Sequence, residues 1–452
     1  SFFIAFSFYC VIRALNTSGR QAAWYWYASY AGLALAVLTK GLLSLVVGGG
    51  TLFLFFLITG TWRRWREFRL GTGTLLFLLI AAPWHILAGI RNQHFFWFYF
   101  VNEHFLRFLG KRYPKDYNKL PALAYWLLHL VWLFPWSFFL PVAIKKLMVQ
   151  WRERRQEDNS SPWSLADQTR LLCLLWSAVV LVFFAFSTNQ EYYTFPAYFP
   201  MLMLVADALA GRERSRLRTV GYFALLIVGW LSAIALSIGL WSSRQLPFQP
   251  DVGSVLTERA VGNYTLSMSH FFDLTGASFA GLRLPAFLAA LGFLLGPAIA
   301  LWLYMRKRAG AAIWAVAFFA ALFLFAAHLA LVRFEPYLSS RSLARAAQKV
   351  ATPESKFMIY GDQSYGSSWI FYLQKQVYLV NGRTTSMQFG SNYPDAPKIF
   401  LNDSELVSQW KGAARIFLFV PLDQEGKIQR LFPHRVFDVA RTSANVVLSN
   451  QP

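Results

Sequence analysis

Residues 306–332 read RKRAGAAIWAVAFFAALFLFAAHLALV, and this stretch indicates the class of architecture. It opens with the three cations Arg306, Lys307 and Arg308, and residues 311–332 then carry no charged side chain. An α-helix rises about 1.5 Å per residue, so this apolar run is long enough to cross a hydrocarbon core roughly 30 Å thick. A cation cluster beside an apolar helix is typical of the cytoplasmic end of a membrane span.

Nine further segments resemble this run in length and character. Together they predict ten spans, near residues 1–15, 23–39, 41–60, 70–90, 121–144, 170–186, 194–210, 219–242, 283–305 and 311–332. Pro83, Pro135 and Pro141 interrupt spans, so we expect an irregular bundle in which neighbouring helices satisfy the broken backbone. The first segment opens at Ser1 without an initiator Met or a basic leader, and we expect further residues to precede it.

The composition excludes a soluble globular enzyme, a disordered chain and a collagen-like fibre. Hydrophobic residues make up 56% of the 452 residues, and charged residues make up 14%, against roughly 25% in soluble domains. The net charge of +21 would by itself suggest nucleic acid. The cations outside the tail lie mostly in short clusters between apolar runs, which favours a membrane protein with no nucleic-acid partner.

Four basic clusters orient the predicted spans. They are Arg63, Arg64, Arg66 and Arg69; Lys145, Lys146, Arg152, Arg154 and Arg155; Arg212, Arg214, Arg216 and Arg218; and Arg306, Lys307 and Arg308. Two spans separate each cluster from the next, so all four lie on one side, which the positive-inside rule makes cytoplasmic. The segments 91–120, 187–193 and 243–282 and the tail 333–452 are therefore expected on the outside.

The tail has the pattern of a small α/β domain. Short β-branched and aromatic runs at 357–360, 377–380, 416–420 and 445–448 alternate with helical stretches such as 343–349 and 405–410. The predicted fold class is thus a polytopic α-helical membrane protein over 1–332 with an external α/β domain over 333–452. Cys10 and Cys173 lie inside apolar runs and predict neither a disulfide framework nor a metal cluster.

An amphipathic helix is predicted near residues 94–111, in the outer membrane interface. At about 100° per residue, Glu103, His104, Arg107 and Lys111 share one arc opposite an apolar face. Two interpretations stay open: a snorkelling anchor, or a site where Arg107 and Lys111 bind the phosphate of an anionic lipid. Glu103 and His104 would add ligands for a divalent metal only with a further ligand from elsewhere.

Two other external turns carry candidate residues. Lys40 lies between the second and third spans, where a charge is either snorkelled or used to bind phosphate. Glu191, Tyr192 and Tyr193 form a short turn at the membrane surface. Interfacial tyrosines are common belt residues, and the functional alternative is binding of a carrier or a sugar.

Short motifs at these positions resemble the GT-C-fold glycosyltransferases that use a lipid carrier, of the glycosyltransferase family 39 type, which include bacterial 4-amino-4-deoxy-L-arabinose transferases and protein O-mannosyltransferases. The motifs are Leu38-Thr39-Lys40-Gly41, Ala82-Pro83-Trp84, Glu103-His104 with Arg107-Phe108, Leu133-Phe134-Pro135-Trp136 and Glu191-Tyr192-Tyr193. The resemblance extends over residues 1 to about 210, and it is most specific from Pro83 to Trp136.

The resemblance implies transfer of a sugar from an undecaprenyl-phosphate carrier to an acceptor (lipid A, protein or another envelope glycan) on the outer face of the bacterial inner membrane. It implies that Lys40, Arg107 and Lys111 bind the carrier phosphate, and that His104 with Glu103 holds a divalent ion. It also implies that three spans and the loop with the catalytic base precede residue 1, so the base is unassigned. Relatives often place a Lys shortly before the Glu-Tyr-Tyr turn, where this chain has Asn189 and Gln190.

The residues leave two other classes of protein open. A lipid or glycan transporter or flippase would be expected to carry a polar site at mid-bilayer in two repeated halves, and the sequence has no such repeat. A membrane-anchored binding protein would use the tail. The tail has no cluster of His, Cys or carboxylates, and Asp362 is interpreted as a turn residue after a strand.

Overall fold

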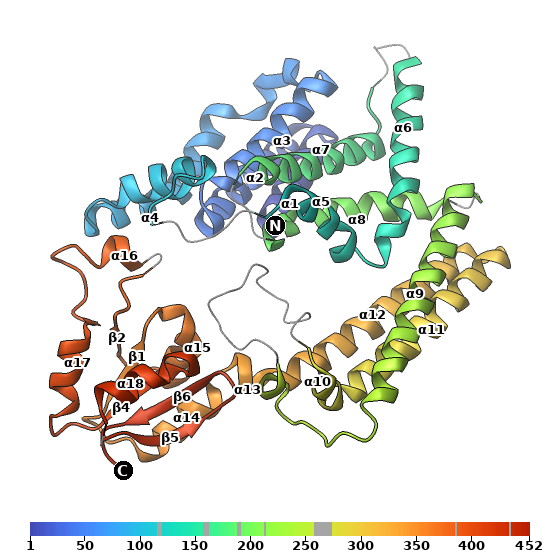
Figure 1. The fold of residues 1–452 in the computed structure, drawn as a ribbon. Coiled ribbons are helices and arrows are strands. Elements are labelled where there is room, and N and C mark those ends of the chain that lie inside the picture. Colours follow the sequence, from blue (N-terminus) through green and yellow to red (C-terminus); the bar gives the residue numbers. More distant parts are fainter. Residues whose placement is uncertain are drawn as a thin grey trace. The chain divides into compact units, whose positions relative to one another are not determined.

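The computed structural model describes residues 1–114, 120–156, 162–187, 191–211, 214–256, 274–384, 387–433 and 435–452. The chain separates into two compact units (Figure 1). Unit 1 comprises residues 1–113 and 117–223, and unit 2 comprises residues 114–116 and 224–452. The long helix α9 (Arg216–Ser242) begins in unit 1 and ends in unit 2.

Unit 1 is a bundle of helices joined by short turns. Its α-helices are α1 (Phe2–Leu15), α2 (Gly19–Lys40), α3 (Leu43–Thr59), α4 (Leu70–Arg91), α5 (Ala122–Trp132), α6 (Leu140–Gln156), α7 (Leu165–Phe186) and α8 (Phe195–Ala210). Between them lie the 3-10 helices η1 (Thr61–Phe68), η3 (Trp136–Phe139) and η4 (Glu191–Thr194) and the π-helix η2 (Trp97–Leu106). Because α1 packs on α2, α2 on α4, α3 on α7 and α7 on α8, the bundle joins distant parts of the sequence.

Aromatic and small residues fill the interior of unit 1. The rings of the buried residues Trp26 and Phe68 lie 4.7 Å apart between centroids. A Cβ on Gly73 of α4 would lie 2.2 Å from the ring of Tyr30, so only glycine allows this approach of α4 to α2. Outward-facing side chains such as Leu79 and Ile90 are apolar and exposed. This distribution suits a bundle whose outer surface meets lipid rather than water.

Among the described residues, six helices are long and apolar enough to cross a membrane, or seven if α5 and the stretch η3–α6 form one bent span. The six are α4, α7, α8 with its preceding turn, α9, α11 (Arg283–Met305) and α12 (Ala309–Arg333). All ten predicted spans contain helix, but α1 and α3 have only 14 and 17 residues. The first turns of α2 include the polar residues Arg20 and Gln21, which lower its hydropathy. The prediction of a multi-span helical membrane protein is confirmed. The number of ten spans stays a prediction.

The segment predicted as one span at 121–144 is two helices. The helix α5 and the continuous stretch η3 and α6 meet at a bend of 98°. Pro135 lies at the break and has no N–H to donate, which weakens a continuous helix there. Pro83 has the opposite outcome, because α4 continues through it to Arg91. The expected interruption at Pro83 is therefore wrong.

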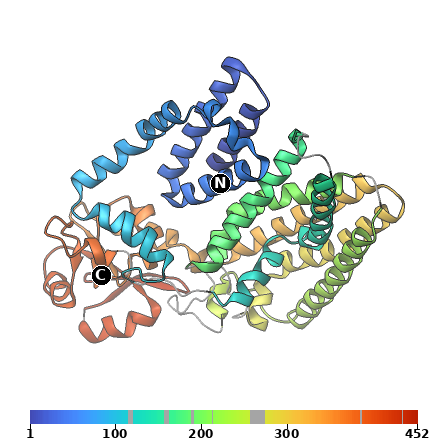
Figure 2. The ribbon, with the colours of Figure 1, turned by 90° about the horizontal axis from the view of Figure 1, so that it is seen from above.

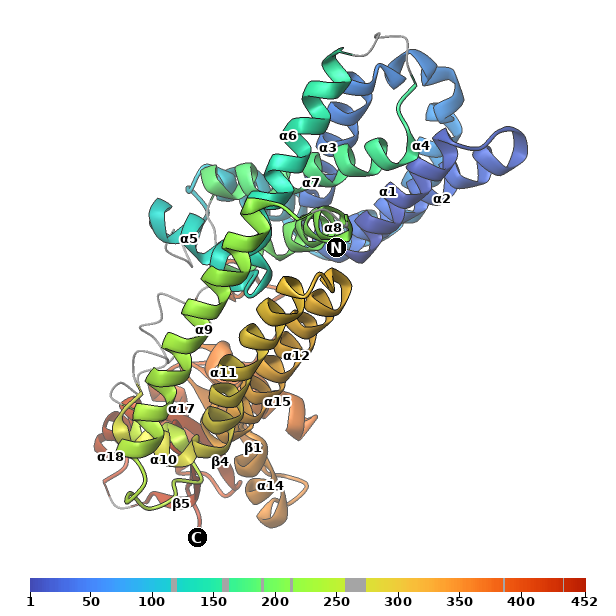
Figure 3. The same cartoon turned by 90° about the vertical axis from the view of Figure 1, so that its right-hand side faces the viewer.

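The apolar helices of unit 2 form an antiparallel pair. Helices α11 and α12 lie side by side, as Figures 2 and 3 show. A Cβ on Gly296 would lie 2.7 Å from the Cβ of Phe319, so a small residue sets the close approach of the two helices. The short helices η5 (Val252–Val255) and α10 (Gly276–Gly281) precede this pair, and α13 (Glu335–Leu338) follows it.

The rest of unit 2 is a six-stranded sheet with the order β3-β2-β1-β4-β6-β5. Its strands are β1 (Lys356–Tyr360), β2 (Val377–Val380), β3 (Phe400–Leu401), β4 (Ile416–Pro421), β5 (Phe437–Arg441) and β6 (Asn445–Ser449). Strands β3, β2, β1 and β4 are parallel, whereas β6 is antiparallel to β4 and β5. The four predicted strands correspond to β1, β2, β4 and β6.

Helices cover both faces of this sheet (Figure 1). Phe357 and Ile359 of β1 point to the face covered by α14 (Arg341–Val350) and α15 (Ser367–Leu373). Met358 and Tyr360 point to the opposite face, covered by α17 (Asp403–Trp410) and α18 (Glu425–Leu431). Because successive side chains of a strand alternate between faces, a strand buried on both faces must be continuously apolar, as β4 and residues 357–360 of β1 are.

Candidate functional site

The candidate site is centred on the turn that follows α2, which carries Lys40. Gly41 has φ +77°, a backbone conformation that side chains with a Cβ rarely adopt. A Cβ at this position would also lie 2.7 Å from Nε2 of His104 and 3.0 Å from Oη of Tyr99. Glycine therefore serves two purposes here, since it closes the turn and lets the turn lie directly on η2.

His104 is tied to this turn through both ring nitrogens. Its Nε2 lies 3.1 Å from the backbone N–H of Leu42, and its Nδ1 lies 2.5 Å from the carbonyl oxygen of Tyr99. A backbone N–H only donates and a carbonyl only accepts, so Nδ1 must carry the proton and Nε2 must be bare. His104 is consequently a neutral positioning residue that joins η2 to the turn after Lys40.

A second histidine supports the same turn of η2. Nδ1 of His85 in α4 donates to the carbonyl oxygen of Ala81 at 2.8 Å, which leaves Nε2 to accept from Oη of Tyr99 at 3.1 Å. Burial raises the pKa of the Tyr99 hydroxyl, in keeping with a protonated donor. The ring of Phe95 stacks on Tyr99 at 5.2 Å between centroids. Tyr99 thus contacts both histidines, with its hydroxyl on one and its carbonyl on the other.

The predicted amphipathic helix is a π-helix over its central part. The backbone N–H of Arg107 bonds to the carbonyl oxygen of Asn102, five residues earlier, rather than to residue 103. The prediction of an α-helix here is therefore wrong in type, although the apolar side chains Phe105 and Phe108 are exposed as expected of an interfacial segment. The buried side chain of Asn102 bonds to the backbone N–H and carbonyl of Tyr113 and holds the returning chain.

Glu103 is the centre of an ion cluster. Its Oε2 accepts from Nη1 of Arg107 at 2.8 Å, and its Oε1 accepts from Nε of Arg112 at 2.7 Å. The side chain of Arg112 is only 6% exposed and that of Glu103 is 17% exposed, so these charges are largely removed from water. Arg107, predicted to bind the carrier phosphate, is therefore also bound to a carboxylate.

The surroundings of Lys40 differ from those of Arg107. It is exposed, and its Nζ lies 5.9 Å from the centroid of the Tyr193 ring. Within the described ranges, no carboxylate forms an ion pair with Lys40. The structure thus brings together two predicted residues from separate turns, Lys40 and Tyr193.

The other predicted site residues are placed less specifically. Tyr192 is exposed and packs edge-on against Tyr193 at 4.9 Å between ring centroids. Lys111 is exposed beyond the end of η2. The side chain of Glu191 and the residues Asn189 and Gln190 lie outside the described residues, as does Arg212 of the third basic cluster.

The residues expected to hold a divalent metal have other partners. Both ring nitrogens of His104 are hydrogen-bonded, and both oxygens of Glu103 accept from arginines. In the part of the chain that the structure describes, no three His, Cys, Asp or Glu side chains are grouped as metal ligands would be. The arrangement does not fit a metal site.

Sequence reasoning missed His85, Asn102 and Arg112. His85 directly follows the Pro83-Trp84 motif, which was the available signal. Arg112 was less accessible to prediction, because it reaches Glu103 only after the chain reverses at Gly110, whose φ is +69°. The spacing of residues 102–113 does not predict this reversal of the chain.

Over part of its length the chain is similar in sequence to lipid-carrier glycosyltransferases. No protein-family model matches the chain. It is 29% identical over 220 residues to an undecaprenyl phosphate-alpha-4-amino-4-deoxy-L-arabinose arabinosyl transferase of Pseudomonas aeruginosa (strain UCBPP-PA14), a match that covers 47% of this chain and 36% of the relative. It is 27% identical over 265 residues to the protein of the same name from Pectobacterium carotovorum subsp. carotovorum, covering 57% and 44%.

Solved structures extend the likeness to the whole fold. ArnT from Cupriavidus metallidurans bound to undecaprenyl phosphate superposes with a TM-score of 0.71 at 23% identity, over 99% of this chain and 73% of that chain. The apo form of the same protein gives a TM-score of 0.69. The predicted resemblance and fold class are confirmed. The sequence matches span less than half of the length of the two relatives.

Proposed function

We propose that the protein is a membrane glycosyltransferase that takes a sugar from a polyprenyl-phosphate carrier and passes it to a lipid or protein acceptor. The observation that carries the proposal is the exposed ammonium of Lys40, held on a turn that neutral side chains fix against η2. The proposal is supported by similarity to the arabinosyl transferases over the part of the chain that contains this turn and η2.

Lys40 has the properties of a phosphate ligand for this reaction. As the sugar leaves the carrier, negative charge develops on the phosphate, and a cation fixed in advance stabilises that charge. A lysine is a compact point charge that binds phosphate without requiring a planar partner. Because the glycine turn and His104 hold the backbone beside Lys40, the ammonium is positioned before the carrier binds.

The Glu103 cluster has a supporting role in this proposal. Arg107 and Arg112 share one carboxylate, so the three side chains together keep one positive charge next to the turn. Arg107 and Lys111 remain candidates for the carrier phosphate, as Tyr192 and Tyr193 do for the sugar. An acceptor hydroxyl must also lose a proton to a general base. Among the described residues we assign no such base.

The location follows from the charge distribution. We propose that the four basic clusters lie on the cytoplasmic side of a bacterial inner membrane and that residues 333–452 form an external domain. On this topology the turn after α2 and the helix η2 lie at the outer face. A carrier whose phosphate lies at the outer membrane interface would there meet Lys40 directly.

A transfer assay tests the proposal. Membranes that contain the protein receive radiolabelled undecaprenyl-phosphate sugars, and label in lipid A, protein and other envelope glycan is measured. Lys40→Ala is expected to reduce transfer by about a hundredfold or more, the usual cost of removing one group that stabilises developing charge. Lys145→Ala, in the exposed basic cluster of α6, is the matched control and should leave transfer unchanged.

Each outcome of this assay has a defined meaning. Loss of transfer in Lys40→Ala but not in Lys145→Ala supports the assignment. Equal transfer by both variants contradicts the role of Lys40. Absence of transfer from every carrier sugar, together with lipid flipping in vesicles, would favour the transporter interpretation over the enzyme.

A further inference from the structure

A cavity of about 570 Å³ lies between α6 and α7, at the end of unit 1 that carries the basic residues of α6. Its lining contains four arginines, Arg152, Arg154, Arg155 and Arg170, and two carboxylates, Glu153 and Asp167. Tyr193 contacts Phe184 near the last turn of α7, whereas the cavity contacts the first turns of that helix. The cavity is thus separate from the candidate site around Lys40.

The lining changes in polarity along α6. On α6 the apolar residues Ile144 and Met148 come first, then Trp151, then the arginines. On α7, Asp167 and Arg170 come before Leu171 and Leu174. Along α6 the cavity therefore has an apolar end at Ile144 and Met148 and a cationic end at the arginines.

Two tryptophans line the cavity, Trp151 between the apolar residues and the arginines of α6, and Trp163 just before α7. The rings of Trp151 and Trp163 lie 6.5 Å apart between centroids. The guanidinium of Arg154 lies 4.8 Å from the centroid of Trp163, and that of Arg155 lies 5.8 Å from Trp151. Tryptophan prefers the level of lipid headgroups, between hydrocarbon and water. Along α6, the order from apolar to interfacial to cationic surroundings matches the order of groups along a phospholipid.

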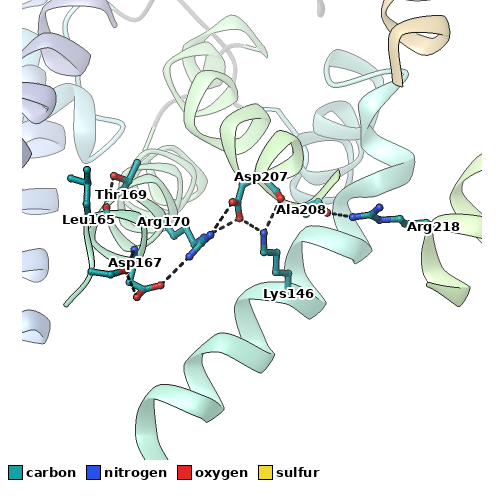
Figure 4. A network of polar contacts seen from close by, with 9 residues as sticks. Lys146, Leu165, Asp167, Thr169, Arg170, Asp207, Ala208 and Arg218 are labelled. Atoms are coloured by element: carbon teal, nitrogen blue, oxygen red, sulfur yellow. Dashed lines mark hydrogen bonds and ion pairs between the residues drawn. The ribbon is translucent and has the colours of Figure 1, made fainter. Parts of the chain in front are cut away.

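A network of ion pairs holds the walls of the cavity in place (Figure 4). Arg170 donates from Nε and Nη2 to the two carboxylate oxygens of Asp207 in α8, at 2.9 and 3.0 Å, and from Nη1 to Asp167 at 3.0 Å. Lys146 of α6 reaches the same Asp207 carboxylate at 2.7 Å. Because α6, α7 and α8 converge on one carboxylate, the cavity is built into the bundle.

One polar atom in the lining lacks a partner. The side-chain oxygen of Gln150 is buried and accepts no hydrogen bond from the residues that the structure describes. A buried acceptor without a donor is costly, so a ligand that brings a hydroxyl or an amine donor would relieve that cost.

We propose that this cavity binds one anionic phospholipid from the leaflet on the side of the basic clusters. The phosphate lies among Arg152, Arg154 and Arg155 at the cationic end of α6. A headgroup donor bonds to Gln150, and the first part of the acyl chains lies along Ile144, Met148 and Leu174. Basic pockets between helices on the cytoplasmic side of a membrane are known to suit such headgroups. The proposal does not depend on the transfer reaction.

Lipid titration followed by native mass spectrometry of the purified full chain tests this proposal. The probes are phosphatidylglycerol, phosphatidylcholine of the same acyl chains, and inorganic phosphate. Arg152→Gln combined with Arg155→Gln is expected to weaken phosphatidylglycerol binding about 25-fold, at roughly fivefold for each charge near a membrane surface. Arg63→Gln combined with Arg66→Gln, in the exposed helix η1, removes the same charge elsewhere and should leave binding unchanged.

A second variant separates loss of the site from loss of the fold. Met148→Trp places a bulky ring at the apolar end without altering charge, and it should also displace the lipid while the melting temperature is retained. The proposal is overturned if the two double variants bind phosphatidylglycerol equally, or if phosphatidylcholine binds as tightly as phosphatidylglycerol. It is also overturned if inorganic phosphate alone competes at a comparable concentration, because the cavity would then recognise free phosphate rather than a lipid.

Discussion

Replacing Asp207 by asparagine should loosen the junction of α6, α7 and α8. The carboxylate accepts three charge-assisted hydrogen bonds, two from Arg170 at 2.9 and 3.0 Å and one from Lys146 at 2.7 Å. Asparagine keeps the shape but offers one acceptor oxygen and turns an N–H₂ donor toward cations. The variant therefore loses about two of the three bonds and the charge that holds both cations.

The magnitude follows from the burial of these groups. A hydrogen bond to a charged partner contributes about 1.5–3 kcal/mol. The Asp207 side chain is 32% exposed and that of Arg170 is 21% exposed, so water replaces part of what is lost. We expect a destabilisation of about 2 kcal/mol, which for a unit of this size lowers the melting temperature by roughly 4–8 °C.

The two cysteines provide the assay. Cys10 and Cys173 are both buried in unit 1. A dye that fluoresces on reaction with thiols therefore reports the unfolding of this unit during a temperature ramp. Glu67→Gln is the matched control, because Glu67 pairs with Arg64 at 2.6 Å on the surface, with side chains 54% and 45% exposed. Such exposed pairs contribute about 0.2–1 kcal/mol. A melting temperature lowered equally by both substitutions would refute the role of burial in this reasoning.

Three further predictions follow from the site and from unit 2. Gly41→Ala should lower transfer at least tenfold by displacing the turn after Lys40, whereas Gly49→Ala, with no atom within 4 Å of the added Cβ, should leave the transfer assay unchanged. His104→Gln can still donate and accept a hydrogen bond and should retain more transfer activity than His104→Ala. Added divalent metal should change the activity of neither variant. Rescue of activity by metal would instead favour the metal site. Burial alone would raise the pKa of Asp403, but hydrogen bonds from neighbouring side chains outweigh it and lower the pKa. The ionised Asp403 carboxylate therefore stabilises the fold fully above its unfolded-state pKa of about 4, and this stabilisation is lost as the pH falls through its folded-state pKa. Over that pH range, hydrogen exchange at β1 should accelerate in the native chain but not in Asp403→Asn.

The regular elements were predictable where a pattern was long or strongly apolar. Strand β4 is buried along its whole length, and its unbroken run of apolar residues predicted a strand. Strand β3 has only two residues, and β5 lies at the sheet edge with an irregularity between Asp438 and Ala440. A short strand and an exposed edge strand carry no alternation of apolar and polar residues that could be recognised beforehand.

The candidate site was predictable as a list of residues but not as a set of contacts. Glu103, His104 and Arg107 were identified together because they share one helical face. Whether a helix closes its hydrogen bonds over four or five residues depends on its packing, so the π-helix could not be read from the sequence. The partnership of Glu103 with Arg112 depends in turn on the reversal at Gly110.

These contacts distinguish Arg107 from Lys40, two cations that were both predicted to bind the carrier phosphate. A phosphate that approaches Arg107 must compete with the carboxylate of Glu103, which already occupies the guanidinium at 2.8 Å. A phosphate that approaches Lys40 meets an exposed ammonium with an aromatic neighbour and no described carboxylate. The free energy gained by binding an anion is greatest where no internal anion has to be displaced. On the proposed function, we therefore propose Lys40 as the first contact of a carrier phosphate, with Arg107 holding Glu103 at the end of η2.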